Sequence, residues 1–379
     1  MLKLGVIGFG NRISSIVKLL LETGEVTLTA VADIHIEDAA ERVAALADKN
    51  SVHYYHDAEE MLNKETLDGI CIGTRCSLHT KYAMLAAQYN LPMFLEKPVC
   101  INYEDLSRLK TIRHMSPKTV VSFPLRMARI VTYVKEVLES GKIGELSQVQ
   151  AYNNVHYARG YYHKWYRDEN ETGGLFLQKA THDLDYIQYV LGGMRPVEVC
   201  AMKSKQVFKG DKPAGFMCEN CPDTKTCPES PENVKKIGNG YAIGKYCCYS
   251  KDNTIEDSGS IIVEYDNGMH VSYTQDFITR HGAAKRGAYI VGYKGTIEFD
   301  FYGSQVKLHR HDENVTETHT FGRTSGGHFG GDNYLVRNFI GVMKGEETSK
   351  MTLKDGSRSL ASFSLTAEQY SITEHFITC

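Results

Sequence analysis

Over the first 120 residues, short apolar runs alternate with segments whose apolar residues recur at helical spacing. The apolar runs predict strands at Leu4–Ile7, Val26–Ala32, Val52–Tyr55, Gly69–Ile72, Met93–Leu95 and Thr119–Phe123. The segments between them predict helices at Ile13–Glu22, Ile36–Asp48, His79–Tyr89 and Tyr103–Met115. Strands that alternate with helices form βαβ units, so this half predicts a parallel sheet with right-handed crossovers.

The pattern changes after residue 123. Helices are predicted at Ile130–Ser140, Leu175–Leu191, Tyr334–Met343 and Ser357–Phe376. Two-residue alternation predicts strands at Val197–Lys203, Ile261–Asp266, His270–Asp276, Ala288–Val291, Thr296–Asp300 and Gln305–Arg310. Consecutive strands without intervening helices indicate an antiparallel or mixed sheet. We therefore expect an α/β protein with an N-terminal domain at 1–123 and an α+β domain at 124–379, which carries a Cys-rich insertion at about residues 215–250.

Length and charge agree with two soluble domains. A chain of 379 residues exceeds what one hydrophobic core usually organises. The formal net charge of −3 argues against a nucleic-acid binder, which would show a basic face. The sequence has no run of about 18 apolar residues and no signal-peptide stretch, so we expect a cytoplasmic protein without a membrane span.

A glycine-rich turn follows the first strand and opens the first helix. Its candidate cofactor-binding residues are Gly8, Phe9, Gly10, Asn11 and Arg12. Glycines there let the backbone approach a pyrophosphate, which the free N–H groups of the helix terminus stabilise. Ile13 departs from the fingerprint, which usually has glycine or alanine at that point.

Asp33 ends the second strand, 25 residues past Gly8, where a carboxylate can bind the ribose hydroxyls of a dinucleotide. Because it would repel a 2′-phosphate, we expect NAD rather than NADP, although Arg12 leaves NADP open. The other candidate cofactor residues lie at later strand ends and are Thr74, His79, Glu96 and Lys97.

The fifth strand ends in Glu96-Lys97-Pro98, and here the chain resembles the Gfo/Idh/MocA family of sugar and cyclitol dehydrogenases. The similarity continues through Gly141-Lys-Ile-Gly-Glu145, Trp165-Tyr-Arg167-Asp168, Gly173-Gly174, His182-Asp-Leu-Asp185, Gly292-Tyr-Lys-Gly295 and His328-Phe-Gly-Gly-Asp332. It implies a Rossmann domain, then an α+β domain with a large, mostly antiparallel sheet. It also implies a cis Lys97–Pro98 bond and a second copy of the chain paired through that sheet.

Lys97 is the main candidate for proton transfer. Oxidation of an alcohol removes a hydroxyl proton while hydride leaves carbon, and a partly desolvated lysine beside a cationic nicotinamide can accept that proton. The resemblance makes His182 the catalytic histidine. Gln178 stands where many family members have aspartate, and glutamine cannot accept a proton. Lys179 either replaces that chemistry or pairs with Asp183, and Glu96 orients its neighbours.

An aromatic-rich stretch precedes the second predicted helix of the α+β half, and aromatic faces stack on sugar C–H surfaces. A core or subunit contact explains the stretch equally well. The candidate substrate residues, several by family analogy, are Arg126, Tyr157, Trp165, His182, Asp185 and His328.

Five of the ten cysteines lie between Cys218 and Cys248. Cys218, Cys221, Cys227 and Cys247 have a spacing suited to one tetrahedral ion, which predicts a structural zinc. An iron–sulfur cluster or free thiols in a surface insertion are the alternatives.

These observations predict an NAD-dependent oxidoreductase that acts on a secondary hydroxyl or ketone of a sugar, glycoside or cyclitol. One alternative is a glycosidase that oxidises the sugar transiently, eliminates the aglycone and returns the hydride. The other is a sugar- or nucleotide-sensing regulator, which the presence of Lys97 disfavours.

Overall fold

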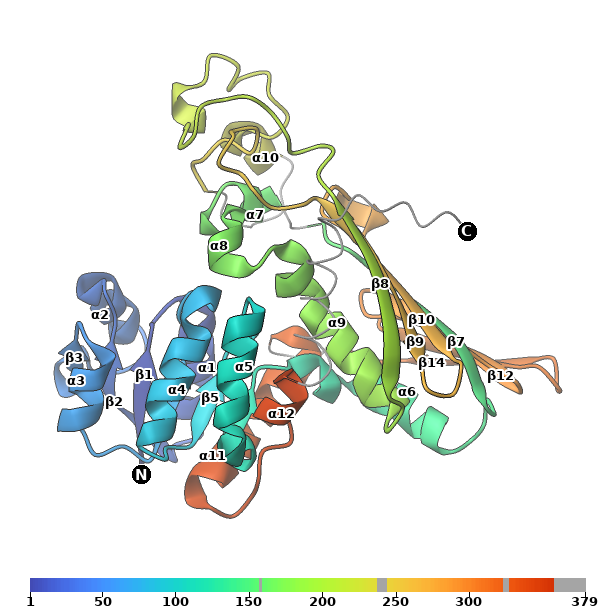
Figure 1. Ribbon diagram of the computed structural model, residues 1–379, viewed down its shortest axis with the longest axis horizontal. Helices are drawn as coiled ribbons and strands as arrows, with labels where there is room; N and C mark the ends of the chain where they lie inside the picture. The colour runs from blue at the N-terminus through green and yellow to red at the C-terminus, as the bar shows by residue number, and fades with distance from the viewer. Residues whose placement is uncertain (157–158, 237–243, 323–326, 358–379) are drawn as a thin grey trace. The chain divides into compact units, whose positions relative to one another are not determined.

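The computed structural model describes residues 1–156, 159–236, 244–322 and 327–357, and these divide into two compact units (Figure 1). Residues 1–129 form the first unit together with 327–357, and the second unit comprises the described residues from 130 to 322. The sequence prediction differs here, because it places everything after residue 123 in the second domain. The predicted helix at Ser357–Phe376 lies outside the described residues from position 358 onward.

The first unit contains a six-stranded parallel sheet in the order β3-β2-β1-β4-β5-β6, which confirms the predicted Rossmann arrangement. Its strands are β1 (Leu2–Ile7), β2 (Val26–Ala32), β3 (His53–Tyr55), β4 (Gly69–Ile72), β5 (Met93–Leu95) and β6 (Thr119–Val121). Its first helices are α1 (Asn11–Glu22), α2 (Ile36–Ala44), α3 (Ala58–Lys64), α4 (His79–Gln88) and α5 (Tyr103–Thr111). Helix α3 is not predicted from the sequence; it spans only 7 residues.

Helix α1 shows why this pattern folds as it does. Its buried residues are Ile13, Ile16, Val17 and Leu20, at the i, i+3, i+4 and i+7 spacing of one helix face. All four are fully buried. The apolar stripe therefore fixes which face of α1 packs inward, and so fixes where the glycine turn before it must lie.

The chain returns to the first unit through α11 (Gly331–Lys344) and α12 (Leu353–Asp355). Phe339 of α11 meets Phe94 of β5 edge to face, with ring centroids 5.8 Å apart. A Cβ on Gly69 would lie 2.5 Å from the sulfur of Met343, so β4 leaves space for this helix. The return segment completes the core of the first unit, and the amphipathic pattern at 334–343 predicts the helix but not its partner.

A charged network also joins the return segment to the glycine turn. The Arg12 guanidinium donates from Nη1 and Nη2 to Asp332 at 2.9 and 2.7 Å, and from Nε to Glu96 at 3.0 Å. Nδ1 of His328 lies 3.1 Å from Asp332. Burial by itself would raise the pKa of Asp332, but the hydrogen bonds from His328 and Arg12 hold it well below its usual range.

The second unit contains an eight-stranded sheet in the order β14-β13-β12-β11-β7-β10-β9-β8. All pairs are antiparallel except β7 with β10, which confirms a mostly antiparallel sheet. The strands are β7 (Leu146–Asn154), β8 (Pro196–Ser204), β9 (Ser258–Tyr265), β10 (His270–Asp276), β11 (Arg286–Gly292), β12 (Gly295–Asp300), β13 (Gln305–Arg310) and β14 (Val315–Thr320). The helices are α6 (Arg129–Glu139), α7 (Arg159–Tyr162), α8 (Glu169–Thr172), α9 (Leu175–Leu191) and α10 (Pro231–Lys236).

Helix α9 runs along one face of this sheet (Figure 1). Phe176 meets Tyr273 of β10, and Tyr186 meets Phe299 and Phe301 near β12, all edge to face with centroids 5.3 to 6.4 Å apart. Every residue from Leu175 to Ile187 is buried. Polar side chains on this helix therefore need partners within the protein.

Asp183 is the central polar residue on the sheet-facing side of α9, and it is fully buried. Its Oδ1 accepts from Nε of Arg286 at 2.7 Å, and its Oδ2 accepts from the Asn153 amide at 2.7 Å and the Tyr273 hydroxyl at 3.0 Å. These three partners come from β11, β7 and β10, so one carboxylate joins the helix to the three central strands. This network explains why Asn153 is buried in β7, a strand that the apolar pattern does not predict.

The Cys-rich segment at 215–250 is mostly exposed or half-buried from 215 to 229, and Cys248 near its end belongs to a second core of the unit. Phe208, Cys248 and Ile255 pack with Val155, Tyr162, Leu175 and Phe277 in one cluster of buried residues. No helix in the described part of the chain is long and apolar enough to cross a membrane. Pairing of two copies through the eight-stranded sheet stays a prediction.

We expect Asp183→Ala to lower the free energy of unfolding by about 3–5 kcal/mol, because it leaves the buried Arg286 charge without its carboxylate. The matched control is Lys307→Ala, which breaks an exposed 3.6 Å ion pair with Glu298 and should cost about 1 kcal/mol or less. Urea unfolding of both variants measures the difference. Equal losses in the two variants would contradict the anchoring role of Asp183.

For Asp332 we expect a stability contribution that depends on pH. Its folded-state pKa lies below the unfolded value of about 3.9, so the contribution is present above pH 4 and disappears as pH falls further. Asp332→Asn should therefore be less stable than the wild type by about 1.5–3 kcal/mol at pH 7, with the gap closing below pH 4. A gap that stays constant from pH 7 to pH 3 in urea unfolding would exclude this.

Candidate functional site

The backbone of the glycine turn has a conformation that would let a ligand approach it closely. Gly8 has φ +77°, a left-handed conformation, and a Cβ there would lie 2.7 Å from Cγ2 of Thr74 and 2.9 Å from its backbone. Gly10 is the N-cap residue of α1, and no side chain caps the helix there. The first turn of α1 also contains no acidic residue. The N-terminus of α1 thus offers backbone donors suited to an anionic pyrophosphate.

The departure at Ile13 has a structural compensation. A Cβ on Gly73, just after β4, would lie 2.4 Å from Cβ of Ile13. The small residue that usually lets this helix approach the sheet is thus found on the sheet side, at Gly73, instead of on the helix. The close approach of α1 to β4 is preserved.

Asp33 connects the end of β2 to the glycine turn. Its Oδ2 accepts a hydrogen bond from the Phe9 N–H at 2.7 Å, and its Oδ1 accepts from the His35 N–H at 2.9 Å. The carboxylate therefore lies beside the turn, as the sequence predicts for a group that binds ribose. The Arg12 side chain instead binds Glu96, Asp332 and the hydroxyl of Ser122 at 3.1 Å, so its charge is already compensated within the unit.

Glu96 and Lys97 follow β5 and are both buried, with 7% and 8% of their surface exposed. The bond from Lys97 to Pro98 is cis, as the family resemblance implies. His79, at the start of α4, places Nδ1 2.7 Å from the Pro98 carbonyl and Nε2 3.3 Å from the Thr74 carbonyl. Burial lowers the pKa of His79, so the ring is neutral and donates one hydrogen bond. His79 thus positions the turn that carries Lys97.

Two predicted substrate residues, Arg126 and His328, also belong to the first unit. Arg126 is buried, pairs with Asp355 at 3.6 Å, and lies over the Phe123 ring with its guanidinium carbon 5.6 Å from the centroid. His328 lies beside Asp332 in the network described above. Both are therefore held by neighbours of their own unit, and contact with a substrate stays a prediction for each.

In the second unit, α9 carries Gln178, Lys179, His182 and Asp185, all of them buried. The amine of Lys179 lies 4.8 Å from the centroid of the Tyr161 ring. Burial lowers the pKa of Lys179 to about 7, and the nearby Arg286 adds to this, while Asp183 opposes it. A lysine with that pKa exchanges protons near neutrality, which is the property required of a general acid or base.

The aromatic residues before α9 differ in how deeply they are buried. Tyr162 is fully buried, lies 4.0 Å from Phe208 between ring centroids, and donates its hydroxyl to the Glu256 carbonyl. Trp165 is only partly buried and stacks on Tyr166 at 3.9 Å. Tyr162 is thus a core residue, whereas Trp165 retains exposed surface. Tyr157 lies outside the described residues.

Sequence analysis alone does not find Arg286 and the central role of Asp183. The only local signal is Asp183 at four residues from Lys179, which suggests an ion pair along the helix. The strong partner is Arg286, more than 100 residues later in β11. The pair matters for the candidate site because Arg286 contributes to the lowered pKa of Lys179.

The predicted zinc site is not supported. Among the described residues, no group of three or more His, Cys, Asp or Glu side chains is arranged to hold a metal ion. Cys218 lies near the Tyr246 carbonyl and interacts with Cys247, whereas Cys221 lies 3.9 Å from Asp223 and Cys248 is buried in the core. The spacing of Cys218, Cys221, Cys227 and Cys247 is therefore not sufficient to define a tetrahedral site.

Comparison with known proteins extends over both units. The family model described as "Oxidoreductase family, NAD-binding Rossmann fold" matches residues 2–122, and "Oxidoreductase family, C-terminal alpha/beta domain" matches 135–371. The putative oxidoreductase YteT of Bacillus subtilis is 26% identical over 322 residues, which are 75% of this chain and 74% of YteT. The Myo-inositol 2-dehydrogenase of Thermotoga maritima is 27% identical over 50% of this chain and 55% of its own length.

Solved structures show the same fold. Levoglucosan dehydrogenase in complex with NADH and levoglucosan superimposes with a TM-score of 0.75 at 16% identity, over 98% of this chain and 96% of that one. The myo-inositol 2-dehydrogenase of Lactobacillus plantarum gives 0.69 at 16% identity, over 98% and 97%. Because the two family models together match most of its length, the chain belongs to the Gfo/Idh/MocA oxidoreductase family.

Proposed function

We propose that this protein is an NAD-dependent oxidoreductase that transfers hydride between a nicotinamide cofactor and a secondary hydroxyl or ketone of a sugar or cyclitol. Family membership and the inositol and levoglucosan dehydrogenases among its relatives support the substrate class. The observation that carries the proposal is Lys97, a buried lysine at the carboxyl end of β5 in a dinucleotide-binding sheet.

The residues of the first unit fit the cofactor. The turn at Gly8 and Gly10 has no side chain in the way of a pyrophosphate, and α1 supplies uncapped N–H groups. Asp33 would accept the ribose hydroxyls and repel a 2′-phosphate. Arg12, the residue that leaves NADP open in the sequence, has its charge bound by Asp332 and Glu96. NAD is therefore the proposed cofactor, and when bound it supplies the hydride acceptor.

Proton transfer is the task of the protein side chains. Lys97 accepts the proton of the reacting hydroxyl in the oxidation direction and returns it in reduction. On α9, His182 hydrogen-bonds the substrate and Gln178 orients a hydroxyl, since a neutral amide cannot accept a proton. Lys179 is the second proton-exchanging group, because burial brings its pKa to about 7.

The test of this function is a panel of free sugars, inositols and aryl glycosides incubated with NAD. Absorbance of NADH should rise with a free sugar or cyclitol, in proportion to the oxidised product. Release of nitrophenol from an aryl glycoside without accumulation of NADH would instead support the redox-cycling glycosidase. Binding of sugars without either reaction would support a regulator.

Lys97→Met should lower the turnover number by about 10²–10⁴, the usual contribution of a positioned acid–base group. Calorimetric affinity for NADH should stay close to that of the wild type, because the cofactor contacts proposed for Gly8 and Asp33 remain. Near-normal turnover in the variant would exclude Lys97 as the proton acceptor.

The pH dependence of kcat/KM tests Lys179. In the oxidation direction a base with a pKa of about 7 gives a rate that rises below pH 7 and levels above it. Lys179→Met should remove this rising limb as well as lower the rate. Lys18→Met, at an exposed position in α1, serves as the control and should leave the profile unchanged. An identical limb in Lys179→Met would show that another group titrates.

A further inference from the structure

Three aromatic side chains in the segment that precedes α9 contact one another. Trp165 stacks on Tyr166 with ring centroids 3.9 Å apart and an interplanar angle of 24°. Tyr166 in turn meets Tyr161 edge to face, with centroids 4.8 Å apart. All three side chains are half-buried, so each keeps part of its surface exposed. Tyr161, Tyr166 and Trp165 thus form an aromatic row at the surface of the second unit.

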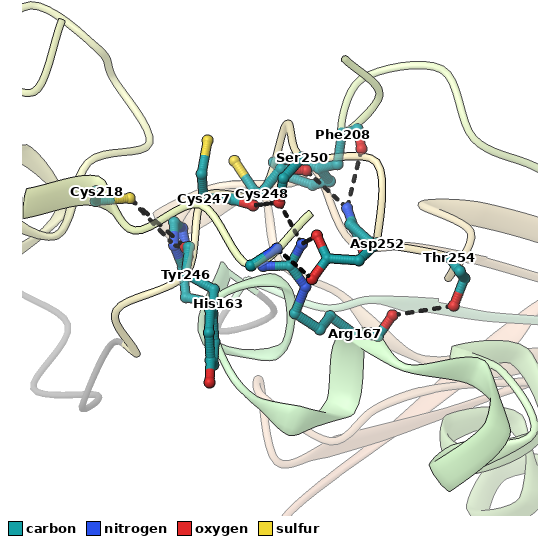
Figure 2. A network of polar contacts seen from close by, with 12 residues as sticks. His163, Arg167, Phe208, Cys218, Tyr246, Cys247, Cys248, Ser250, Asp252 and Thr254 are labelled. Atoms are coloured by element: carbon teal, nitrogen blue, oxygen red, sulfur yellow. Dashed lines mark hydrogen bonds and ion pairs between the residues drawn. The ribbon is translucent and has the colours of Figure 1, made fainter. Parts of the chain in front are cut away.

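Buried residues on both sides of the two stacked rings hold the row in place (Figure 2). Nδ1 of His163 lies 2.5 Å from the Tyr246 carbonyl. The guanidinium of Arg167 donates to the Asp252 carboxylate at 2.6 Å, and the Arg167 carbonyl accepts from the Thr254 N–H at 3.0 Å. Because these contacts already order the backbone of the row, little conformational freedom is lost when a ligand stacks on it.

One end of the row lies beside a proposed proton-exchanging group. The amine of Lys179 lies 4.8 Å from the centroid of the Tyr161 ring, a distance at which the face of an aromatic ring attracts an ammonium ion. A sugar whose hydroxyl reaches this amine therefore has Tyr161 as a neighbour. A substituent of that sugar can then reach the next rings of the row.

The chemistry of the row favours a ligand with a flat ring and an apolar face. Aromatic rings stack on other aromatic rings and on the C–H faces of sugars. Three adjoining rings also present a wider apolar surface than the C–H face of one sugar covers. A methyl substituent on the reacting sugar would leave most of this surface uncovered, whereas a phenyl group or a second sugar ring would cover it.

We propose that the aromatic row is an aglycone subsite, and that the substrate is a glycoside whose aglycone is a flat ring with an apolar face. This inference rests on the proposed function, because Lys179 is the group that places the reacting sugar beside the row. It narrows the sugar class to glycosides and gives Tyr161 and Tyr166, which are not among the substrate candidates from the sequence, a role in binding.

Fluorescence tests the subsite directly, because Trp165 is the only tryptophan of the chain. The wild-type protein is titrated with phenyl and methyl glycosides of glucose, galactose and N-acetylglucosamine, with excitation restricted to tryptophan. At least one phenyl glycoside should shift the emission to shorter wavelengths in a saturable manner, because its ring displaces water from the indole. The methyl glycoside of the same sugar should require a concentration about 2–10-fold higher.

Steady-state kinetics with NAD tests the link to the reacting sugar. In the wild type the KM of the phenyl glycoside should be about 2–10-fold lower than that of the methyl glycoside. Trp165→Ala should abolish most of this preference, whereas Trp165→Phe, which retains a ring, should keep most of it. Tyr293→Ala is the matched control and should keep the wild-type preference, since Tyr293 is 84% exposed and lies outside the row. Circular dichroism checks that each variant is folded.

The outcomes separate this inference from the proposed function. Equal KM values for phenyl and methyl glycosides, with NADH formed from both, would overturn the subsite and leave the dehydrogenase intact. An unchanged preference in Trp165→Ala, or no emission shift with any glycoside, would also overturn the subsite. A saturable shift with phenyl glycosides, but no NADH from any sugar or glycoside, would support the subsite and contradict the proposed function.

Discussion

Parallel pairing of β1 with β2 and β4 is the constraint on which the first unit depends. Strands that run in one direction bring their carboxyl ends to one edge of the sheet. The glycine turn follows β1, Asp33 follows β2, Thr74 follows β4 and Lys97 follows β5, so residues far apart in sequence share that edge. Hydrogen bonds then fix the arrangement locally, from Phe9 to Asp33 and from His79 to the carbonyls of Thr74 and Pro98.

In the second unit a buried charge has the corresponding role. Asp183 holds α9 against three central strands, and its partner Arg286 also helps to lower the pKa of Lys179. Burying such a pair costs solvation energy, which an apolar contact would not. The helix thus retains polar side chains in buried positions.

The sequence predicts elements whose side chains follow a simple apolar period. Helix α1 and strand β4 are found where predicted because their buried faces are continuous. β14 is not predicted because all six of its residues are exposed and carry no apolar alternation. β7 is not predicted because Asn153, a polar residue, occupies its buried face through a contact with Asp183 that is distant in sequence. The predicted site residues follow from motifs, whereas Arg286 follows only from tertiary structure.

Long-range packing also explains the remaining differences between the structure predicted from the sequence and the observed one. The contacts of α11 with β5 and of Asp332 with Arg12 join segments more than 200 residues apart, which no local pattern reveals. The cysteines illustrate the opposite error, since their spacing is typical of metal sites, but no group of three or more potential ligands is arranged around an ion in the described part of the chain.

The central claim, that the carboxyl edge of the first sheet is an NAD site, is tested most directly by calorimetric titration of the purified protein with NADH and with NADPH. The account predicts that NADH binds more tightly than NADPH, and that Gly8→Val abolishes binding because its side chain would meet the backbone of Thr74. Tighter binding of NADPH, or no binding of either nucleotide to the wild-type protein, would contradict it.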